Sequence, residues 1–573
     1  MKEKILIIGG VAAGPKAASR IMRVNPYAEV TIIDQDSLVS YGGCGIPYYV
    51  SGDVADEKEL RSTNFHMLRD EFFFRQAKGV KVLTSTRATA INRQEKNVEV
   101  QQVETGEKQK LDYDKLLLAT GSSPLVLPIA GTDLDGVFTI SDLHKAIEIK
   151  DRVAKGKVGK VVVIGGGAIG IEMAEAFADL WGLETSIVEF MDQLLPRIVN
   201  WPMAAILAKH LRDHQVNLFL GEGAVEILGK NGVVTGLKTS KRTIEADMVI
   251  MAAGVRPRSE LAKEAGLNVS AMGAIVVNQR MQTSDPNIYA AGDCVEIPHL
   301  VSGRRFFAPL GSLANKEGRV AGDNMAGIPT VFKGAVGAFI MKGFDMCIGA
   351  AGLSLEAALA EGFDADVSLT SPADRAHFFP GQEVACFELV FDKRTRRVLG
   401  FQGIGPMNDG ISARIDAAAV SIANGAVIED FANLEMAYAP PFSAAIDSIN
   451  AAAYVASNIC DGLMRKIDMD VFYQWMEDPS SHPDWVVLDV RHPVQVRPFA
   501  DKFGKDLWRA MPYEQLRDRW AELPTDKTMI IFCNAGSRSY EMQRILDHHG
   551  RTNNLVLSGG FNVIKRIGGS WLP

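Results

Sequence analysis

Residues 160–189 read KVVVIGGGAIGIEMAEAFADLWGLETSIVE, and residues 4–34 read KILIIGGVAAGPKAASRIMRVNPYAEVTIID. Each stretch opens with a β-branched strand, continues through a glycine turn into an alanine-rich helix, and closes with an apolar strand that ends in an acid. Parallel strands need a crossover connection, usually a helix, so this order predicts a parallel sheet with helices on its faces. The repeat therefore predicts two α/β units of the same type in the first half of the chain.

Both glycine turns suit the pyrophosphate of a dinucleotide. Glycines let the backbone approach the phosphates, the helix N-terminus offers N–H groups, and the terminal acid accepts hydrogen bonds from a ribose. The second turn fits G-x-G-x-x-G fully, whereas the first has Val11 at the second glycine position. Two nucleotides in one chain suggest FAD and a nicotinamide. The expected FAD contacts are Gly9, Gly10, Gly14 and Asp34; the expected NAD contacts are Gly165, Gly167, Gly170, Glu189 and Gly254.

Two further strand ends support a flavin. Residues 116–121 read LLLATG and residues 287–293 read NIYAAGD, so each apolar strand ends in a glycine turn. Either could be an ordinary strand end. Together they match the flavin contacts of two-dinucleotide flavoproteins, which implies FAD contacts at Thr120 and Gly121 and a ribityl contact at Asp293.

Cys44 lies in the segment SYGGCGIPYY, residues 40–49, soon after the first ribose acid. Its glycine neighbours allow close approach, and Pro47 fits the first turn of a helix. A helix N-terminus stabilises a thiolate, which is the nucleophilic form. We therefore expect Cys44 to be a redox nucleophile; the alternative is an inert buried cysteine.

Residues 1–455 resemble the single-cysteine branch of the pyridine-nucleotide–disulfide reductase family. Most of these reductases carry C-x-x-x-x-C, but here Tyr49 follows Cys44 at that spacing. The resemblance implies that Cys44 cycles through a mixed disulfide with a small thiol or through a sulfenic acid. Related oxidases and peroxidases typically have a histidine in the first glycine turn. Residues 9–14 contain none, which favours the coenzyme A-disulfide type.

Lys16, Arg20 and Arg23 share one face of the first predicted helix and could bind the phosphates of coenzyme A. An ordinary solvated helix face is the alternative. The resemblance adds Ser40, Gly43 and Asn315 as coenzyme A contacts. It also implies that Tyr438, in AYAPPFS at residues 437–443, reaches the flavin site of a partner subunit. Phe378 stands where coenzyme A-disulfide reductases often have a second tyrosine.

Near the C-terminus, the strand TMIIF at residues 528–532 runs into CNAGSRS at residues 533–539. Such a loop curls N–H groups around a sulfur, and Arg538 adds charge, so Cys533 could carry a thiolate or persulfide. With WVVLDVR at 485–491 and LSGG at 557–560, residues 468–573 resemble a rhodanese domain. The usual G-H-I and N-I-P stretch is missing after Arg491, which leaves a degenerate domain with a structural role as the alternative.

The predicted fold class is α/β. We expect an FAD-binding domain at 1–149 and 247–329, an NAD-binding domain at 150–246, and an α+β dimerisation domain at 330–456. A linker is expected at 459–470 and a rhodanese-like α/β domain at 468–573. In the dimerisation domain, strands are predicted at 385–391 and 397–403, and helices at 411–424 and 444–458.

The chain has 573 residues, a net charge of −8 and six dispersed cysteines without C-x-x-C, so neither a metal site nor a disulfide framework is signalled. The charge argues against nucleic acid as a partner, and no leader or membrane span is recognised, so a cytoplasmic protein is expected. The expected dimerisation domain and the resemblance imply a homodimer that acts on small sulfur compounds. The predicted function is NADH-dependent reduction of coenzyme A disulfide, coenzyme A persulfide or polysulfide through Cys44, with sulfane sulfur handled by Cys533. The alternatives are an NADH oxidase or peroxidase using a Cys44 sulfenic acid, and a redox or sulfur sensor with low turnover.

Overall fold

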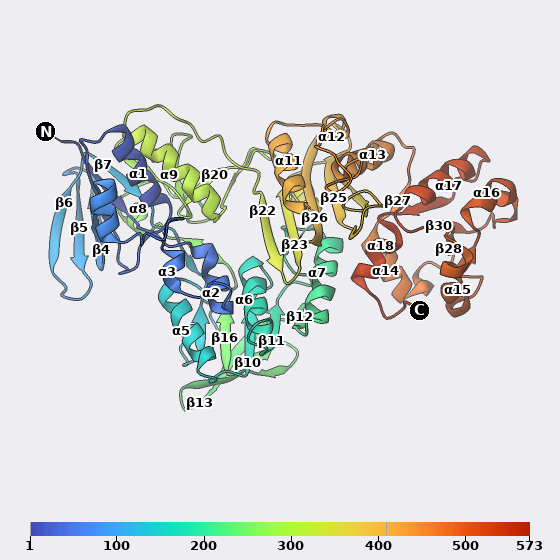
Figure 1. Ribbon diagram of the computed structural model, residues 1–573, viewed down its shortest axis with the longest axis horizontal. Helices are drawn as coiled ribbons and strands as arrows, with labels where there is room; N and C mark the ends of the chain where they lie inside the picture. Colours follow the sequence, from blue (N-terminus) through green and yellow to red (C-terminus); the bar gives the residue numbers. More distant parts are fainter. Residues whose placement is uncertain (1, 408–409) are drawn as a thin grey trace. The chain divides into compact units, whose positions relative to one another are not determined.

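The protein is described here by a computed structural model over residues 2–407 and 410–573. The chain forms two compact units, one from Met1–Asp192 and Gln215–Ala335, the other from Gln193–His214 and Val336–Pro573. Figure 1 shows the elements of each unit. Among the described residues, the helices are all too short or too polar to cross a membrane.

The first unit contains a parallel sheet of order β19-β7-β1-β2-β3. Its strands are β1 (Lys4–Ile8), β2 (Glu29–Ile33), β3 (Lys81–Leu83), β7 (Lys115–Leu118) and β19 (Ile288–Ala290). Helix α1 (Ala13–Val24) crosses from β1 to β2 and packs against α9 (Gly311–Met325). The strands are buried along most of their length, as parallel strands covered on both faces must be. The predicted strand–helix–strand unit is confirmed.

A second parallel sheet in this unit has the order β12-β11-β10-β16-β9. Its strands are β9 (Val137–Thr139), β10 (Lys160–Ile164), β11 (Glu184–Glu189), β12 (Asn217–Leu220) and β16 (Met248–Met251), with α6 (Ala168–Ala178) as the crossover. Strand β9 precedes the predicted NAD-binding range of 150–246 and β16 follows it. Neither strand carries a nucleotide motif, so a boundary drawn from motifs could not include them.

Two small antiparallel sheets also belong to the first unit. Each has three strands: β4 (Thr86–Asn92), β5 (Asn97–Gln102) and β6 (Lys108–Asp112), and β13 (Ala224–Lys230), β14 (Val233–Thr239) and β15 (Thr243–Glu245).

The second unit contains an antiparallel sheet of order β22-β23-β26-β25-β24. Its strands are β22 (Phe339–Gly343), β23 (Met346–Gly352), β24 (Ala365–Thr370), β25 (Cys386–Asp392) and β26 (Val398–Pro406). Helices α11 (Ile411–Ala423) and α13 (Ser448–Cys460) pack on it, and α7 (Trp201–Asp213) contacts β26 (Figure 1). The predicted strands are confirmed. The last helix begins at Ser448, later than predicted, because the Asp447 carboxylate caps it by accepting the Ile449 N–H at 3.1 Å.

The C-terminal sheet is parallel, of order β27-β31-β30-β28-β29. Its strands are β27 (Lys466–Ile467), β28 (Trp485–Asp489), β29 (Trp508–Ala510), β30 (Thr528–Phe532) and β31 (Asn554–Leu557). The flanking helices are α14 (Met469–Glu477), α15 (Pro493–Phe503), α16 (Tyr513–Arg519), α17 (Ser537–His548) and α18 (Gly560–Ile567).

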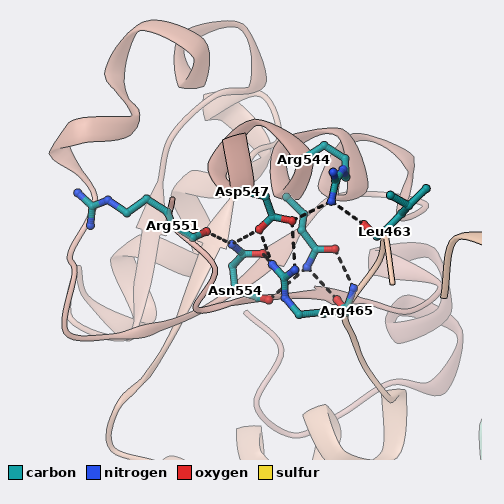
Figure 2. Close-up of polar contacts among 7 residues, drawn as sticks. Leu463, Arg465, Arg544, Asp547, Arg551 and Asn554 are labelled. Atoms are coloured by element: carbon teal, nitrogen blue, oxygen red, sulfur yellow. Dashed lines mark hydrogen bonds and ion pairs between the residues drawn. The ribbon is translucent and has the colours of Figure 1, made fainter. Parts of the chain in front are cut away.

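The predicted linker at 459–470 is wrong at both ends, because α13 runs to Cys460 and β27 begins at Lys466. The segment between them is fixed to α17. The Arg465 guanidinium binds both oxygens of Asp547, at 3.1 and 2.5 Å, and the Asn554 side chain at 3.0 Å (Figure 2). The Gln543 side chain hydrogen-bonds both the N–H and the carbonyl of Arg465. The connection is therefore a structured edge of the C-terminal sheet.

Candidate active site

The first glycine turn can be built only from glycine at its key positions. Gly9 has φ +115°, and a Cβ there would lie 2.0 Å from the Ala119 carbonyl oxygen. A Cβ on Gly14 would lie 1.9 Å from the Gly9 carbonyl oxygen. Asp34 Oδ2 accepts the Gly10 N–H at 2.6 Å, which fixes the carboxylate at the end of β2. The turn thus has the shape and donors of a pyrophosphate cradle with a ribose acid beside it.

The other predicted flavin contacts also lie at strand ends of the first sheet. Thr120 Oγ1 donates to the Arg258 carbonyl at 2.5 Å, and Gly121 has φ +69°. Asp293 follows β19 and accepts the Ser122 hydroxyl at 3.3 Å. Burial raises the pKa of Asp293, opposed by that hydrogen bond. One long hydrogen bond leaves this carboxylate with acceptor capacity, so it fits the hydroxyls of a ribityl chain.

The second glycine turn repeats the geometry of the first. Gly165 has φ +117°, and a Cβ on Gly170 would lie 2.0 Å from the Gly165 carbonyl oxygen. A Cβ on Gly167 would meet nothing within 4 Å, and the same holds for Gly254, which has φ +111°. Glu189 ends β11, and its two oxygens accept the N–H groups of Gly166 at 2.6 Å and Met191 at 2.8 Å. The turn therefore fits a second nucleotide.

Cys44 lies in a 3₁₀ turn, Gly43–Gly45, that leads into α2 (Ile46–Ser51), with Pro47 in the first turn of the helix as predicted. The cysteine is exposed. A second helix N-terminus meets it: a Cβ on Gly311, the first residue of α9, would lie 3.4 Å from the Cys44 sulfur. Sequence reasoning missed Gly311, because α9 lies far along the chain from Cys44.

The N–H groups expected to stabilise the Cys44 thiolate do lower the pKa of the thiol, but other protein groups outweigh them. Although the residue is exposed, surrounding protein atoms partly desolvate its sulfur and raise the pKa of the Cys44 thiol, and the charges of Glu172 and Asp293 raise it further. Hydrogen bonds from the N–H groups of Gly311 and Cys44 itself lower the pKa and are outweighed. The carboxylate of Glu172 comes from α6, which packs on α2.

Glu172 is itself perturbed. Burial raises its pKa to about 7, the Glu175 charge adds to the effect, and the hydrogen bond with Tyr48 opposes it. A carboxyl group that titrates near neutrality and acts on the charge of Cys44 was not predicted. Its only sequence signal is an acid two residues after the last glycine of the G-x-G-x-x-G turn.

The predicted coenzyme A face is only partly free. Lys16 and Arg23 are exposed on α1, but the Arg20 guanidinium is ion-paired with Asp323 of α9, a buried carboxylate. Asn315 and Gly43 are exposed and lie on the two segments that meet at Cys44, α9 and the 3₁₀ turn.

Ser40 differs from the other predicted coenzyme A contacts. Its side chain is buried, its φ is +53°, and its N–H donates to the Gly10 carbonyl at 2.7 Å. In this conformation Ser40 fixes the chain between the first glycine turn and Cys44.

Tyr438 belongs to the second unit. It lies in the segment between α12 (Ile428–Ala432) and α13, and 51% of its surface is exposed. Phe442 in the same segment is 78% exposed. The segment thus presents aromatic surface, as expected of one that contacts another subunit.

Cys533 lies at the end of β30 and is buried. The Gly536 N–H donates to its sulfur at 3.1 Å, and α17 begins directly afterwards at Ser537. This loop therefore has part of the predicted N–H cradle. Arg538 is exposed, with its guanidinium carbon 5.8 Å from the centre of the Tyr513 ring.

The region that lacks the G-H-I stretch still forms a packed core. The buried guanidinium of Arg491 binds Asp489 Oδ2 at 2.8 Å, and the Trp508 indole N–H donates to the same oxygen at 3.0 Å. The guanidinium also lies within 5 Å of the ring centres of Phe499, Phe532 and Phe561. The departure from the usual sequence has therefore not removed the sheet or its core.

The model of the pyridine nucleotide-disulphide oxidoreductase family matches residues 3–305, and the model of its dimerisation domain matches residues 341–449. The chain belongs to this oxidoreductase family. Membership implies FAD and a nicotinamide nucleotide as cofactors. A rhodanese-like domain model matches residues 470–566, so the resemblance predicted for the C-terminal segment is confirmed.

Two solved structures are similar to this oxidoreductase over nearly its whole length, including the C-terminal domain. An NAD-dependent persulfide reductase from A. fulgidus is 37% identical with a TM-score of 0.91, covering 98% of this chain and 99% of that one. Reduced CoADR-RHD from Bacillus anthracis is 30% identical with a TM-score of 0.90, covering 99% and 98%. A curated relative, the NAD(P)H coenzyme A polysulfide/persulfide reductase of Pyrococcus horikoshii, is 37% identical over 79% of this chain and 98% of its own length.

Proposed function

We propose that this oxidoreductase uses NADH to reduce the sulfur–sulfur bond of coenzyme A disulfide, coenzyme A persulfide or polysulfide at Cys44. The observation that carries the proposal is the surroundings of Cys44. It is an exposed thiol at the meeting point of two helix N-termini, beside the flavin-type strand end at Asp293. Tyr49, where a second cysteine would stand, is buried and aromatic. The resolving thiol must then come from the substrate.

The reaction balances with one cysteine. The Cys44 thiolate attacks a sulfur of coenzyme A disulfide, forming a mixed disulfide and releasing one coenzyme A thiolate. Two electrons from NADH and one proton then convert the mixed disulfide to the Cys44 thiolate and a second coenzyme A thiol. With coenzyme A persulfide, attack on the sulfur attached to coenzyme A releases hydrosulfide instead.

Bound FAD supplies the two-electron connection between NADH and the cysteine. The protein's own groups position and tune the thiol. The Gly311 N–H lowers the pKa of Cys44, whereas burial and Glu172 raise it. Glu172, with a pKa of about 7, can hold or release a proton near Cys44 at neutral pH. We assign NADH over NADPH because the fixed Glu189 carboxylate would repel a 2′-phosphate.

Coenzyme A is supported as the thiol by charge and by the relatives. Lys16 and Arg23 are exposed cations on the helix that leaves the first glycine turn. Relatives that lack a match to the C-terminal domain do not discriminate, because they include both an NADH oxidase from Methanocaldococcus jannaschii, 34% identical over 78% of this chain, and the coenzyme A polysulfide/persulfide reductase, which matches 79%. The A. fulgidus and B. anthracis structures cover nearly all of this chain. The C-terminal domain therefore favours sulfur chemistry over the oxidase alternative.

We assign sulfane-sulfur handling to Cys533, whose sulfur already accepts one loop N–H. A persulfide on Cys533 would pass its terminal sulfur to the coenzyme A thiolate, giving coenzyme A persulfide as substrate for Cys44. Tyr438 would act on the flavin side of a partner subunit. The homodimer, the cytoplasmic location and the individual ligand contacts remain predictions.

The decisive variant is Cys44→Ser. Serine cannot form the mixed disulfide, so we expect normal FAD content with loss of reductase activity on coenzyme A disulfide and on persulfide. The matched control is Cys294→Ser, at a buried cysteine that hydrogen-bonds the backbone. Retained turnover in Cys44→Ser would refute the mechanism. Oxygen or peroxide consumption by the wild type that exceeds all its activity on sulfur substrates would favour the oxidase alternative.

A further inference from the structure

Two histidines and an aspartate of the second unit lie close together in the structure. All three are remote in sequence from Cys44 and Cys533. His210 lies in the last turn of α7 and His214 is the C-cap residue one turn later, so their rings lie on the same side, with centroids 4.4 Å apart. Asp345 lies at the tip of the turn between β22 and β23. One side-chain atom from each of the three residues lies within 4.8 Å of the others.

The distances suit one small cation. His210 Nε2 lies 2.9 Å from Asp345 Oδ1, and His214 Nε2 lies 4.0 Å from the same oxygen. Ligand atoms of a tetrahedral zinc ion, bonded at 2.0–2.1 Å, lie about 3.3 Å apart. The two separations bracket that value. The His210–Asp345 contact is short, yet His210 Nε2 makes no well-aligned hydrogen bond among the described residues.

A hydrogen bond fixes His214 in the tautomer whose Nε2 can bind a metal ion. Its Nδ1 lies 2.9 Å from the His210 carbonyl oxygen, an acceptor, so Nδ1 carries the proton. The lone pair of the neutral ring is then on Nε2, the atom that faces Asp345. A metal-binding histidine frequently donates the N–H of its other ring nitrogen to a backbone carbonyl.

The turn that carries Asp345 is held in place by the same histidine. Phe344 has φ +56°, a region that bulky side chains rarely adopt, and its ring stacks on His214 with centroids 4.2 Å apart. The Asp345 side chain is 81% exposed. The nearby Asp213 carboxylate pairs with Lys209 at 2.5 Å, so it is already engaged.

We propose that His210, His214 and Asp345 bind a divalent transition-metal ion, with zinc the best match to two imidazoles and one carboxylate. Three protein ligands leave one coordination position for water. The ion would join the C-terminal turn of α7 to the β22–β23 turn, two segments distant in sequence. Its role would be structural, because α7 also packs against α14, α18 and β26 within this unit.

The test uses Co²⁺ as a spectroscopic substitute for zinc, added to the metal-free, FAD-loaded full chain. We expect one equivalent to bind, with d–d absorption to the red of the flavin bands and no sulfur charge transfer. Asp345→Asn should lower the affinity at least tenfold, since loss of even an outer partner of a ligand costs about 10–100-fold. His214→Gln should do the same.

His482→Ala is the control at an exposed histidine elsewhere and should bind like the wild type. Zinc should raise the melting temperature of the wild type and of His482→Ala, but not of Asp345→Asn. Because Asp345 is exposed, Asn there keeps the fold, so weak binding by this variant cannot be attributed to misfolding. Equal metal affinity in the wild type and Asp345→Asn, sulfur ligation of the cobalt, or no saturable binding would overturn the proposal.

Discussion

Arg20→Ala should lower the stability of the protein, whereas Arg23→Ala should weaken coenzyme A binding, although both remove a cation from the same face of α1. The Arg20 side chain is 23% exposed and pairs with Asp323, whose side chain is 4% exposed. Without Arg20, the side-chain partners left to Asp323 among the described residues are the Thr330 hydroxyl at 3.4 Å and the Arg319 guanidinium at 4.0 Å. Breaking a fully buried pair costs about 3–5 kcal/mol, so we expect about 1.5–3 kcal/mol for this partly exposed one.

Arg23→Ala should leave stability within about 0.5 kcal/mol, because Arg23 is exposed. It should instead raise KM for coenzyme A disulfide about tenfold, the loss expected for one charge-assisted contact of about 1.5 kcal/mol. KM for a small polysulfide should not change.

Flavin release during urea unfolding reports the unit that contains α1 and α9, and steady-state kinetics give the two KM values. Arg20→Lys is the matched control for the ion pair. If Arg20→Ala were as stable as wild type, Asp323 would not depend on that pair. If Arg23→Ala raised KM for coenzyme A disulfide and KM for polysulfide equally, the cations of α1 would not bind coenzyme A.

Three further predictions concern the nucleotide, the second cysteine and Glu172. The wild type should show a higher kcat/KM for NADH than for NADPH, and Glu189→Ala should narrow the difference; equal values in the wild type would show that Glu189 is not the ribose contact. Cys533→Ser should leave reduction of coenzyme A disulfide intact and abolish sulfur transfer from thiosulfate to a thiol; loss of the first activity with normal flavin would place Cys533 in the electron path. Because the Glu172 charge raises the pKa of Cys44, Glu172→Gln should shift the pH profile of Cys44 alkylation to lower pH. The difference should be largest above pH 7, where Glu172 is ionised in the wild type, and an unchanged profile would contradict it.

The sequence predicted correctly those elements whose determining residues lie close together along the chain. The strand–turn–helix–strand units were predictable because the glycines and the acid that form each cradle lie within about thirty residues of one another. The predicted linker failed because Lys466 is held by Asp366 and Asp468, and the first of these contacts is long-range.

The chemistry of the sites depended more on long-range packing. The pair between Arg20 and Asp323 spans 303 residues, so the sequence could not show that Arg20 is neutralised. The same limit hid Gly311 and Glu172, which approach Cys44 from α9 and α6. The spacing of His210 and His214 is visible in the sequence, but Asp345 is brought to them only by the turn between β22 and β23.

The central claim is that the sulfur–sulfur bond is broken at Cys44, and the covalent intermediate tests it most directly. The NADH-reduced enzyme would be mixed with excess coenzyme A disulfide without oxygen, quenched in acid, and digested for peptide mass analysis. We predict coenzyme A in disulfide linkage on the peptide that contains Cys44, absent in Cys44→Ser and unchanged in Cys533→Ser. Coenzyme A found on Cys533 alone, with an unmodified Cys44 during active turnover, would contradict the account.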